Sequence, residues 1–158
     1  RLLLVGAGPM RGELERLAHE LRVPVVFTGG TSDVAGALAA MDVLAAPSVQ
    51  ETFGLGVLEA LAAGLPVRYT ACPALDDLPP GEAPGARRLP TDPAVWSAEL
   101  ARVLAGDRAG DRDRTRVPPV VARYDIARQA AELARLYLPG PAARGVAPIR
   151  ERAQDAAT

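Results

Sequence analysis

The strongest constraint on the fold is the alternation of short apolar runs with longer segments of helical period. The runs lie at residues 2–5, 25–27, 43–46 and 66–70, and the segments between them carry apolar side chains three and four positions apart. Short runs that lack polar alternation are typical of parallel strands buried on both faces, and such strands are joined by helices. The sequence therefore predicts an α/β fold, a Rossmann-like parallel sheet flanked by helices.

The same patterns place the remaining elements. Helical periods and one further short strand occur at residues 10–22, 34–41, 94–104 and 125–138, and at 87–89. Ser32 or Asp33 is expected to cap the helix that begins at residue 34. Residues 71–85 are rich in proline, glycine and aspartate, which predicts a long loop. We expect one domain over residues 1–138 and a disordered tail over 139–158, where no period survives.

Composition excludes several kinds of protein. The 158 residues carry a formal net charge of −1, so there is no basic footprint for nucleic acid. Cys72 is the only cysteine and His19 the only histidine, which excludes an internal disulfide and a histidine- or cysteine-rich metal site. No apolar run approaches the roughly 20 residues of a membrane span. Every basic side chain is arginine, as in GC-rich bacterial genes, and the start at Arg1 directly before a strand indicates a truncated protein.

Residues 47–67 hold the strongest candidate for a functional site. Glu51 lies in a loop, Glu59 lies on the helix that follows, and Phe53 to Gly56 between them read Phe-Gly-Leu-Gly. The glycines leave backbone amides open at the start of this helix, where geometry and the helix dipole favour an anion. A carboxylate one or two turns further on can accept charge-assisted hydrogen bonds from a pair of sugar hydroxyls. A phosphate cradle beside a hydroxyl acceptor is what a nucleotide-sugar site requires.

Simpler explanations exist for several of these features. Glu51 and Glu59 could be solvated acids that the helix dipole favours near a helix start. Residues 6–12 resemble a dinucleotide fingerprint, but Arg11 stands where the third glycine is needed, so a tight turn is the better explanation. Three arginines are candidates for neutralising a diphosphate, although a solvated surface position explains them more simply: Arg68, Arg87 and Arg88.

Five motifs in one order give a more specific indication. They are Val5-Gly6-Ala7-Gly8-Pro9, Val25-Val26-Phe27-Thr28-Gly29, Met41-Asp42 before Pro47-Ser48, Glu51 and Glu59 as E-x7-E, and Ala63-Gly64-Leu65-Pro66-Val67. This series resembles the C-terminal, donor-binding domain of group 1 (family 4) retaining glycosyltransferases of the GT-B fold. The resemblance covers residues 2–67 well and extends loosely to about residue 138. It implies that the chain is one half of a GT-B architecture.

The resemblance also implies a role for individual residues. It assigns one catalytic residue and seven donor-binding residues: Glu51, and Phe53, Gly54, Leu55, Glu59, Gly29, Gly30 and Gly8. Glu59 would hold the ribose hydroxyls, and Glu51 would face the donor sugar. The turn at Gly29 and Gly30 would lie against the base. Such enzymes generally need no metal for catalysis, so no cofactor is expected beside the nucleoside-diphosphate sugar.

We therefore expect the donor half of a cytoplasmic, retaining, hexosyl-type glycosyltransferase. Its partners would be the nucleotide sugar and a missing N-terminal acceptor domain, through which the full enzyme could associate with a membrane surface. Family members carry an arginine and a lysine before the point where this chain begins, and residues 68–77 depart from the family pattern. We expect this chain alone to be inactive. Two alternatives stay open: a non-catalytic GT-B-derived partner or regulatory module, and a GT-B-like nucleotide-sugar epimerase.

Overall fold

The computed structural model describes residues 1–106 and 117–137. The chain divides into two compact units, Arg1–Val121 and Ala122–Thr158. The tail expected at residues 139–158 lies outside the described residues, so that expectation stays a prediction.

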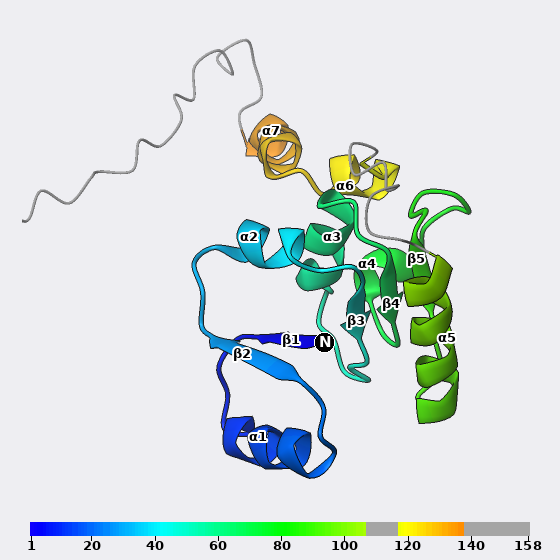
Figure 1. The fold of residues 1–158 in the computed structure, drawn as a ribbon. Coiled ribbons are helices and arrows are strands. Elements are labelled where there is room, and N and C mark those ends of the chain that lie inside the picture. The colour runs from blue at the N-terminus through cyan, green and yellow to red at the C-terminus, as the bar shows by residue number, and fades with distance from the viewer. Residues whose placement is uncertain (107–116, 138–158) are drawn as a thin grey trace, which may run out of the picture. The chain divides into compact units, whose positions relative to one another are not determined.

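Strands and helices alternate through the first unit (Figure 1). The order is β1 (Leu2–Val5), α1 (Arg11–Glu20), β2 (Val25–Gly29), α2 (Val34–Ala39), β3 (Leu44–Ala46), α3 (Leu55–Ala62), β4 (Val67–Tyr69), α4 (Pro73–Asp76), β5 (Ala86–Arg88) and α5 (Pro93–Gly106). Helix α6 (Pro119–Arg123) crosses the boundary between the units, and α7 (Ile126–Tyr137) belongs to the second.

All the strand pairs are parallel, as predicted, but the strands form two sheets instead of one. β1 pairs with β2, with Leu2 opposite Val25, and the other sheet has the order β3-β4-β5. No strand in the described part of the chain joins β1 to β3 (Figure 1). β1 and β3 therefore each have one edge without a partner strand, whereas in a single sheet these two edges would pair.

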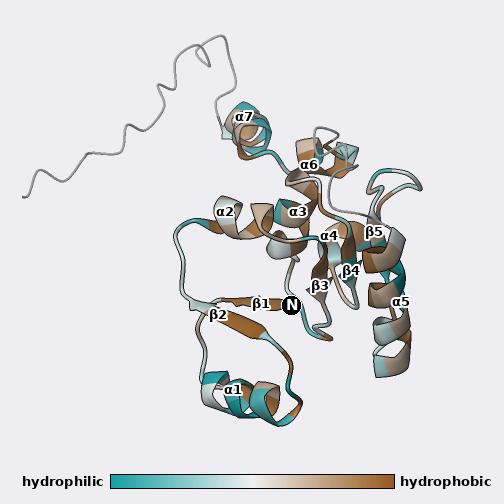
Figure 2. Ribbon diagram, viewed as in Figure 1, coloured by the Kyte–Doolittle hydropathy of each residue, from teal (hydrophilic) through white to brown (hydrophobic). Residues whose placement is uncertain are grey.

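The buried core belongs to the second sheet and its helices. All three residues of β4 are buried, and α3 buries Val57, Leu58 and Leu61 against this region. By contrast, no residue before Leu38 is buried, and helix α1 buries none of its side chains. Figure 2 shows the same contrast, with apolar strands β1 and β2 beside a largely hydrophilic α1.

Two local predictions can be compared with the observed caps and turns. Asp33 caps α2, where its Oδ1 accepts a hydrogen bond from the amide of Gly36 at 2.8 Å. The long loop expected at residues 71–85 is wrong in its first part, because α4 occupies Pro73–Asp76. Pro73 at the first helical position needs no amide partner and has the φ of a helix, so it favours this start.

An ion cluster around the buried Glu99 and Arg68 links β4, β5 and α5. Arg68 Nε donates to Glu99 Oε1 at 2.7 Å, and Arg87 and Arg102 also donate to the Glu99 carboxylate, at 2.9 and 2.7 Å. Hydrogen bonds from Arg102 are the main cause of a pKa for Glu99 of about 2, against an opposing effect of burial. The expectation of a solvated Arg68 is wrong, because Glu99 gives this buried guanidinium a partner.

Helix α7 lies in the second unit and buries none of its side chains. Asp125 Oδ1 accepts a hydrogen bond from the amide of Arg128 at 2.9 Å, which begins the helix, and Arg128 also pairs with Glu132 at 3.1 Å. Four large apolar side chains are more than half exposed: Ile126, Leu133, Leu136 and Tyr137. None of the described helices is long and apolar enough to cross a membrane.

Candidate functional site

The loop after β3 folds the first predicted carboxylate back onto its own backbone. Glu51 Oε1 accepts hydrogen bonds from the amides of Thr52 and Phe53, at 2.9 and 3.4 Å. The side chain is exposed, and Oε2 has no donor among the described residues. One oxygen therefore fixes the carboxylate to the loop, and the other is free to accept from a ligand hydroxyl.

Gly54 begins α3 in a conformation that depends on the absence of a side chain. Its φ of 100° and ψ of 39° lie in the left-handed region, which side chains disfavour. A Cβ at this position would overlap Cys72 Sγ and would lie 3.3 Å from Cys72 Cβ. The amide of Ala74 also donates to Phe53 O at 3.0 Å. The loop therefore packs against Cys72 and the first turn of α4.

The N-terminus of α3 is open to a ligand. Gly54 O accepts from the amides of Val57 and Leu58 at 3.0 and 3.2 Å, and no side chain caps the helix. The amides of Leu55 and Gly56 have no acceptor among the described residues, as is usual for the first helical positions. Such amides, at the positive end of the helix dipole, are suited to a phosphate.

Glu59 lies on the exposed face of the same helix. It stands four residues after Leu55, which places it on the same face and about 6 Å further along the helix axis. Both side chains are exposed, whereas Leu58 and Ala60 on either side of Glu59 are buried. The open amides and the carboxylate therefore face solvent together, one helical turn apart.

The three predicted glycines near the chain start lie on the other sheet. Gly29 ends β2 and its carbonyl accepts from the amide of Gly6 at 2.8 Å, so the carboxyl ends of β1 and β2 meet. Gly8 lies in the turn before α1, where its carbonyl accepts from the amide of Arg11 at 3.2 Å. Gly30 follows β2 directly. Gly29 and Gly30 therefore lie at the end of β2 and Gly8 lies in the turn after β1, as expected, and both places belong to a different sheet from the one that Glu51 and Glu59 follow.

Thr70 is a residue near this site that sequence reasoning missed. It follows β4, and its amide donates to Ala46 O at 3.1 Å, next to the start of the Glu51 loop. Its hydroxyl Oγ1 is buried and has no partner among the described residues. A threonine at the end of an apolar strand carries no signal of this in the sequence, because the position of the hydroxyl depends on the neighbouring strand.

The three candidate arginines are distributed between two places. Arg68 and Arg87 are both held by Glu99. Arg88 is exposed at the end of β5, where its Nε donates to Thr70 O at 2.9 Å and its Nη1 lies 3.5 Å from Asp76 Oδ1. Only Arg88 of the three is next to the carboxyl end of β4, and Asp76 already offsets part of its charge.

The Cys72 thiol is expected to react slowly in the folded chain. Burial is the main cause of a raised pKa, and the nearby carboxylates of Asp76 and Glu51 act in the same direction. Because the thiolate is the reactive form, alkylation by iodoacetamide at pH 8 should be at least about ten-fold slower than in the denatured chain. Mass spectrometry of the two samples over time gives both rates. Equal rates would contradict the buried position of this sulfur.

No group of three or more potential metal ligands occurs in residues 1–106 and 117–137. The groups that the site exposes are the open amides of α3 and the carboxylates of Glu51 and Glu59. Together they can bind an anion and accept hydrogen bonds from hydroxyl groups.

Comparison with known proteins identifies relatives of this chain. A family model described as glycosyl transferases group 1 matches residues 1–106. A GDP-mannose-dependent alpha-(1-6)-phosphatidylinositol dimannoside mannosyltransferase of Mycobacterium tuberculosis is 48% identical over 81 residues, which are 49% of this chain and 21% of the relative. A D-inositol 3-phosphate glycosyltransferase of Corynebacterium urealyticum is 33% identical over 147 residues, 87% of this chain and 34% of the relative.

A solved structure shows the same fold over most of the chain. The sucrose-phosphate synthase of Thermosynechococcus elongatus superposes with a TM-score of 0.67 at 30% identity, over 86% of this chain and 37% of that protein. The chain thus spans about a fifth to a little over a third of the length of the proteins it resembles.

Proposed function

This chain belongs to the group 1 glycosyltransferases, and from that premise we propose that it is the nucleotide-sugar-binding half of a retaining enzyme. The substrate would be a nucleoside-diphosphate hexose, and no metal would take part. The cytoplasmic location expected from the sequence is part of the same proposal. The name of the mycobacterial relative makes GDP-mannose the first donor to test.

The single observation that supports this function most strongly is the arrangement at the start of α3. Two open amides, of Leu55 and Gly56, and the carboxylate of Glu59 share one exposed face, a helical turn apart. A diphosphate on the amides would leave a ribose within reach of the carboxylate, which can accept from two neighbouring hydroxyls. Gly54 is needed for this arrangement, because a Cβ at this position would overlap Cys72 and displace the start of the helix.

The proposed chemistry is the loosening of the bond between the anomeric carbon and the diphosphate. The amides at the start of α3 stabilise the negative charge that develops on the leaving diphosphate, because they are already oriented toward it. Glu51 holds the sugar ring through the carboxylate oxygen that its own loop leaves free, which fixes the reactive pose. The chain offers no group that we assign as a covalent nucleophile.

The acceptor side and the remaining positive charge would come from the rest of a longer polypeptide. The relatives are about three to five times longer than the part they share with this chain, which leaves room for another domain. Arg88 is the described arginine next to the carboxyl end of β4, and a salt bridge to Asp76 partly occupies it. We therefore propose that this chain binds the donor and does not transfer sugar by itself.

Glu59→Ala should weaken binding of the matching nucleoside diphosphate by about 1.5–3 kcal/mol, the range for hydrogen bonds to a charged group. The measurement is saturation-transfer NMR of the chain with GDP-, UDP- and ADP-sugars, followed by titration with the donor that binds. The method tolerates the weak affinity expected of half a site.

Glu13→Ala is the matched control, since Glu13 is an exposed acid in the first turn of α1. It should leave the signal unchanged. Equal affinity of the Glu59 variant and the parent chain would remove Glu59 from the ribose contact. Absence of saturation transfer to all three donors would favour a non-catalytic module. Product analysis on the longer polypeptide distinguishes a sugar transferase from an epimerase.

A further inference from the structure

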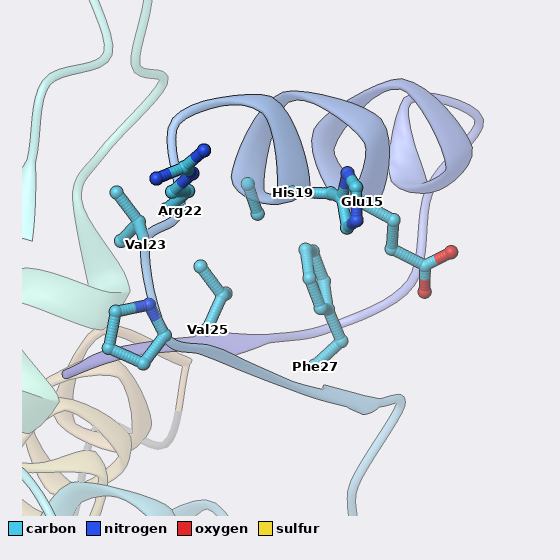
Figure 3. A pocket seen from close by; sticks show the side chains of 8 residues that line it. Glu15, His19, Arg22, Val23, Val25 and Phe27 are labelled. Carbon is cyan, nitrogen blue, oxygen red and sulfur yellow. The ribbon is translucent and has the colours of Figure 1, made fainter.

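A cavity of about 860 Å³ lies between α1 and β2 (Figure 3). Val25 and Phe27 point from β2 toward the helix and form an apolar floor, while Glu15, His19 and Arg22 line the helix side. None of these residues belongs to the candidate nucleotide-sugar site. The hollow is broadly open to solvent, and its volume is within the range of clefts that bind small organic ligands.

The charges around this cavity do not balance. Glu15 already accepts a hydrogen bond from Arg11 Nε at 2.8 Å, and the Arg11 guanidinium lies over the Phe27 ring, 5.6 Å from its centre. Glu15 and Arg22 lie at opposite ends of the cavity in Figure 3. Among the described residues, no carboxylate pairs with Arg22 and no acceptor bonds to its guanidinium. The cavity therefore presents one cation without a counter-ion beside an apolar floor.

The backbone at Arg22 is strained. Its φ of 53° makes it the one non-glycine residue with a positive φ in the described part of the chain. It ends α1 in a Schellman turn, in which the amides of Val23 and Arg22 donate to Ala18 O and His19 O at 2.9 and 3.1 Å. Glycine is the usual residue at this position because a Cβ disfavours the left-handed conformation. Strain of this kind is concentrated at functional sites.

We propose that this cavity binds an organic monoanion, a carboxylate with an apolar body. The planar guanidinium of Arg22 matches a carboxylate with two parallel hydrogen bonds, and a single unpaired cation balances a single negative charge. The apolar body lies on Val25 and Phe27, which are only partly buried without it. The proposal explains why a strained arginine stands where glycine would fit better, and it does not depend on the sugar-donor function.

The test is a titration of the whole chain with 3-phenylpropanoate, followed by amide shifts in two-dimensional NMR spectra. We expect shifts at Ala18, Val25 and Phe27, and none with the uncharged 3-phenylpropanol. Arg22→Gly should raise the Kd at least about ten-fold, as expected when a hydrogen-bonded charge is removed. The melting temperature of the same variant should be no lower than that of the parent, because glycine relieves the strain. A loss of binding would therefore not result from unfolding.

Arg16→Gln is the matched control, since Arg16 lies on α1 and pairs with Glu20 at 3.8 Å instead of lining the cavity. Its Kd should equal that of the parent chain. The proposal is wrong if the alcohol binds as well as the acid, if inorganic phosphate binds equally, or if Arg22→Gly leaves the Kd unchanged. An absence of shifts at millimolar 3-phenylpropanoate would also overturn it.

Discussion

Gly54→Ala is expected to destabilise the chain by about 2–5 kcal/mol, a large fraction of the stability of a domain this size. Two causes add. An alanine disfavours the left-handed backbone at φ 100°, and its Cβ would overlap the buried Cys72 sulfur. Relief of either strain would move the start of α3, so the open amides of Leu55 and Gly56 would no longer face a ligand together. Urea unfolding gives the stability, and nucleotide titration gives the binding.

The double variant Gly54→Ala/Cys72→Ala separates the two causes. It removes the sulfur and leaves the backbone strain, so it should recover the part of the loss that comes from overlap, beyond the effect of Cys72→Ala alone. Gly56→Ala is the matched control, because a Cβ there meets nothing within 4 Å. It should fold at least as well as the parent. If Gly54→Ala unfolded at the same urea concentration as Gly56→Ala, the tight contact with Cys72 would be refuted.

Glu99→Gln is expected to lower the melting temperature at pH 7 and to remove a specific part of the acid sensitivity. The variant leaves the buried guanidinium of Arg68 beside two further arginines with no counter-charge, and breaking a buried pair in this way is strongly destabilising. The carboxyl has a pKa of about 2 in the folded chain and 4.5 as its ordinary value. A lowered pKa stabilises the fold above about 4.5 and loses that effect as the pH falls toward 2.

The difference in melting temperature between the parent and Glu99→Gln should therefore be largest above pH 4.5 and shrink toward pH 2. Differential scanning calorimetry over this pH range measures it. Glu132→Gln is the control, since its exposed pair with Arg128 contributes at most about 0.5 kcal/mol. The Glu99 effect should be several-fold larger at neutral pH. A difference that stayed constant from pH 7 to pH 2 would show that the charge of Glu99 is not the cause.

Features that depend on neighbouring residues in the sequence were predictable. The apolar runs became strands with parallel pairing, and the Asp33 cap formed where expected, because each depends on a few residues of known preference. The family model over residues 1–106 confirms the resemblance that the ordered motifs indicated. The roles of the individual site residues remain predictions.

Features that depend on distant contacts were not predictable. Arg68 is buried because Glu99, 31 positions later, returns on α5 to accept its hydrogen bond. The open edges of β1 and β3 likewise depend on which strands are neighbours, whereas an apolar run shows only that a strand exists. The tight fit of Gly54 against Cys72 is a third case, since nothing in either local sequence predicts that contact.

The absence of buried residues before Leu38 has a consequence for cooperativity. A segment with few buried contacts opens at a lower free energy than the core, so we expect residues 1–37 to exchange their amide hydrogens through partial unfolding while β3, β4 and β5 stay intact. A ligand that touches both the Gly8 turn and the α3 amides would bind only the molecules in which this segment is folded. Its apparent affinity would be the intrinsic affinity multiplied by the fraction of molecules in which this segment is folded. The measured donor affinity would then depend on the local folding equilibrium of the first βαβ unit as much as on the contacts of Glu59.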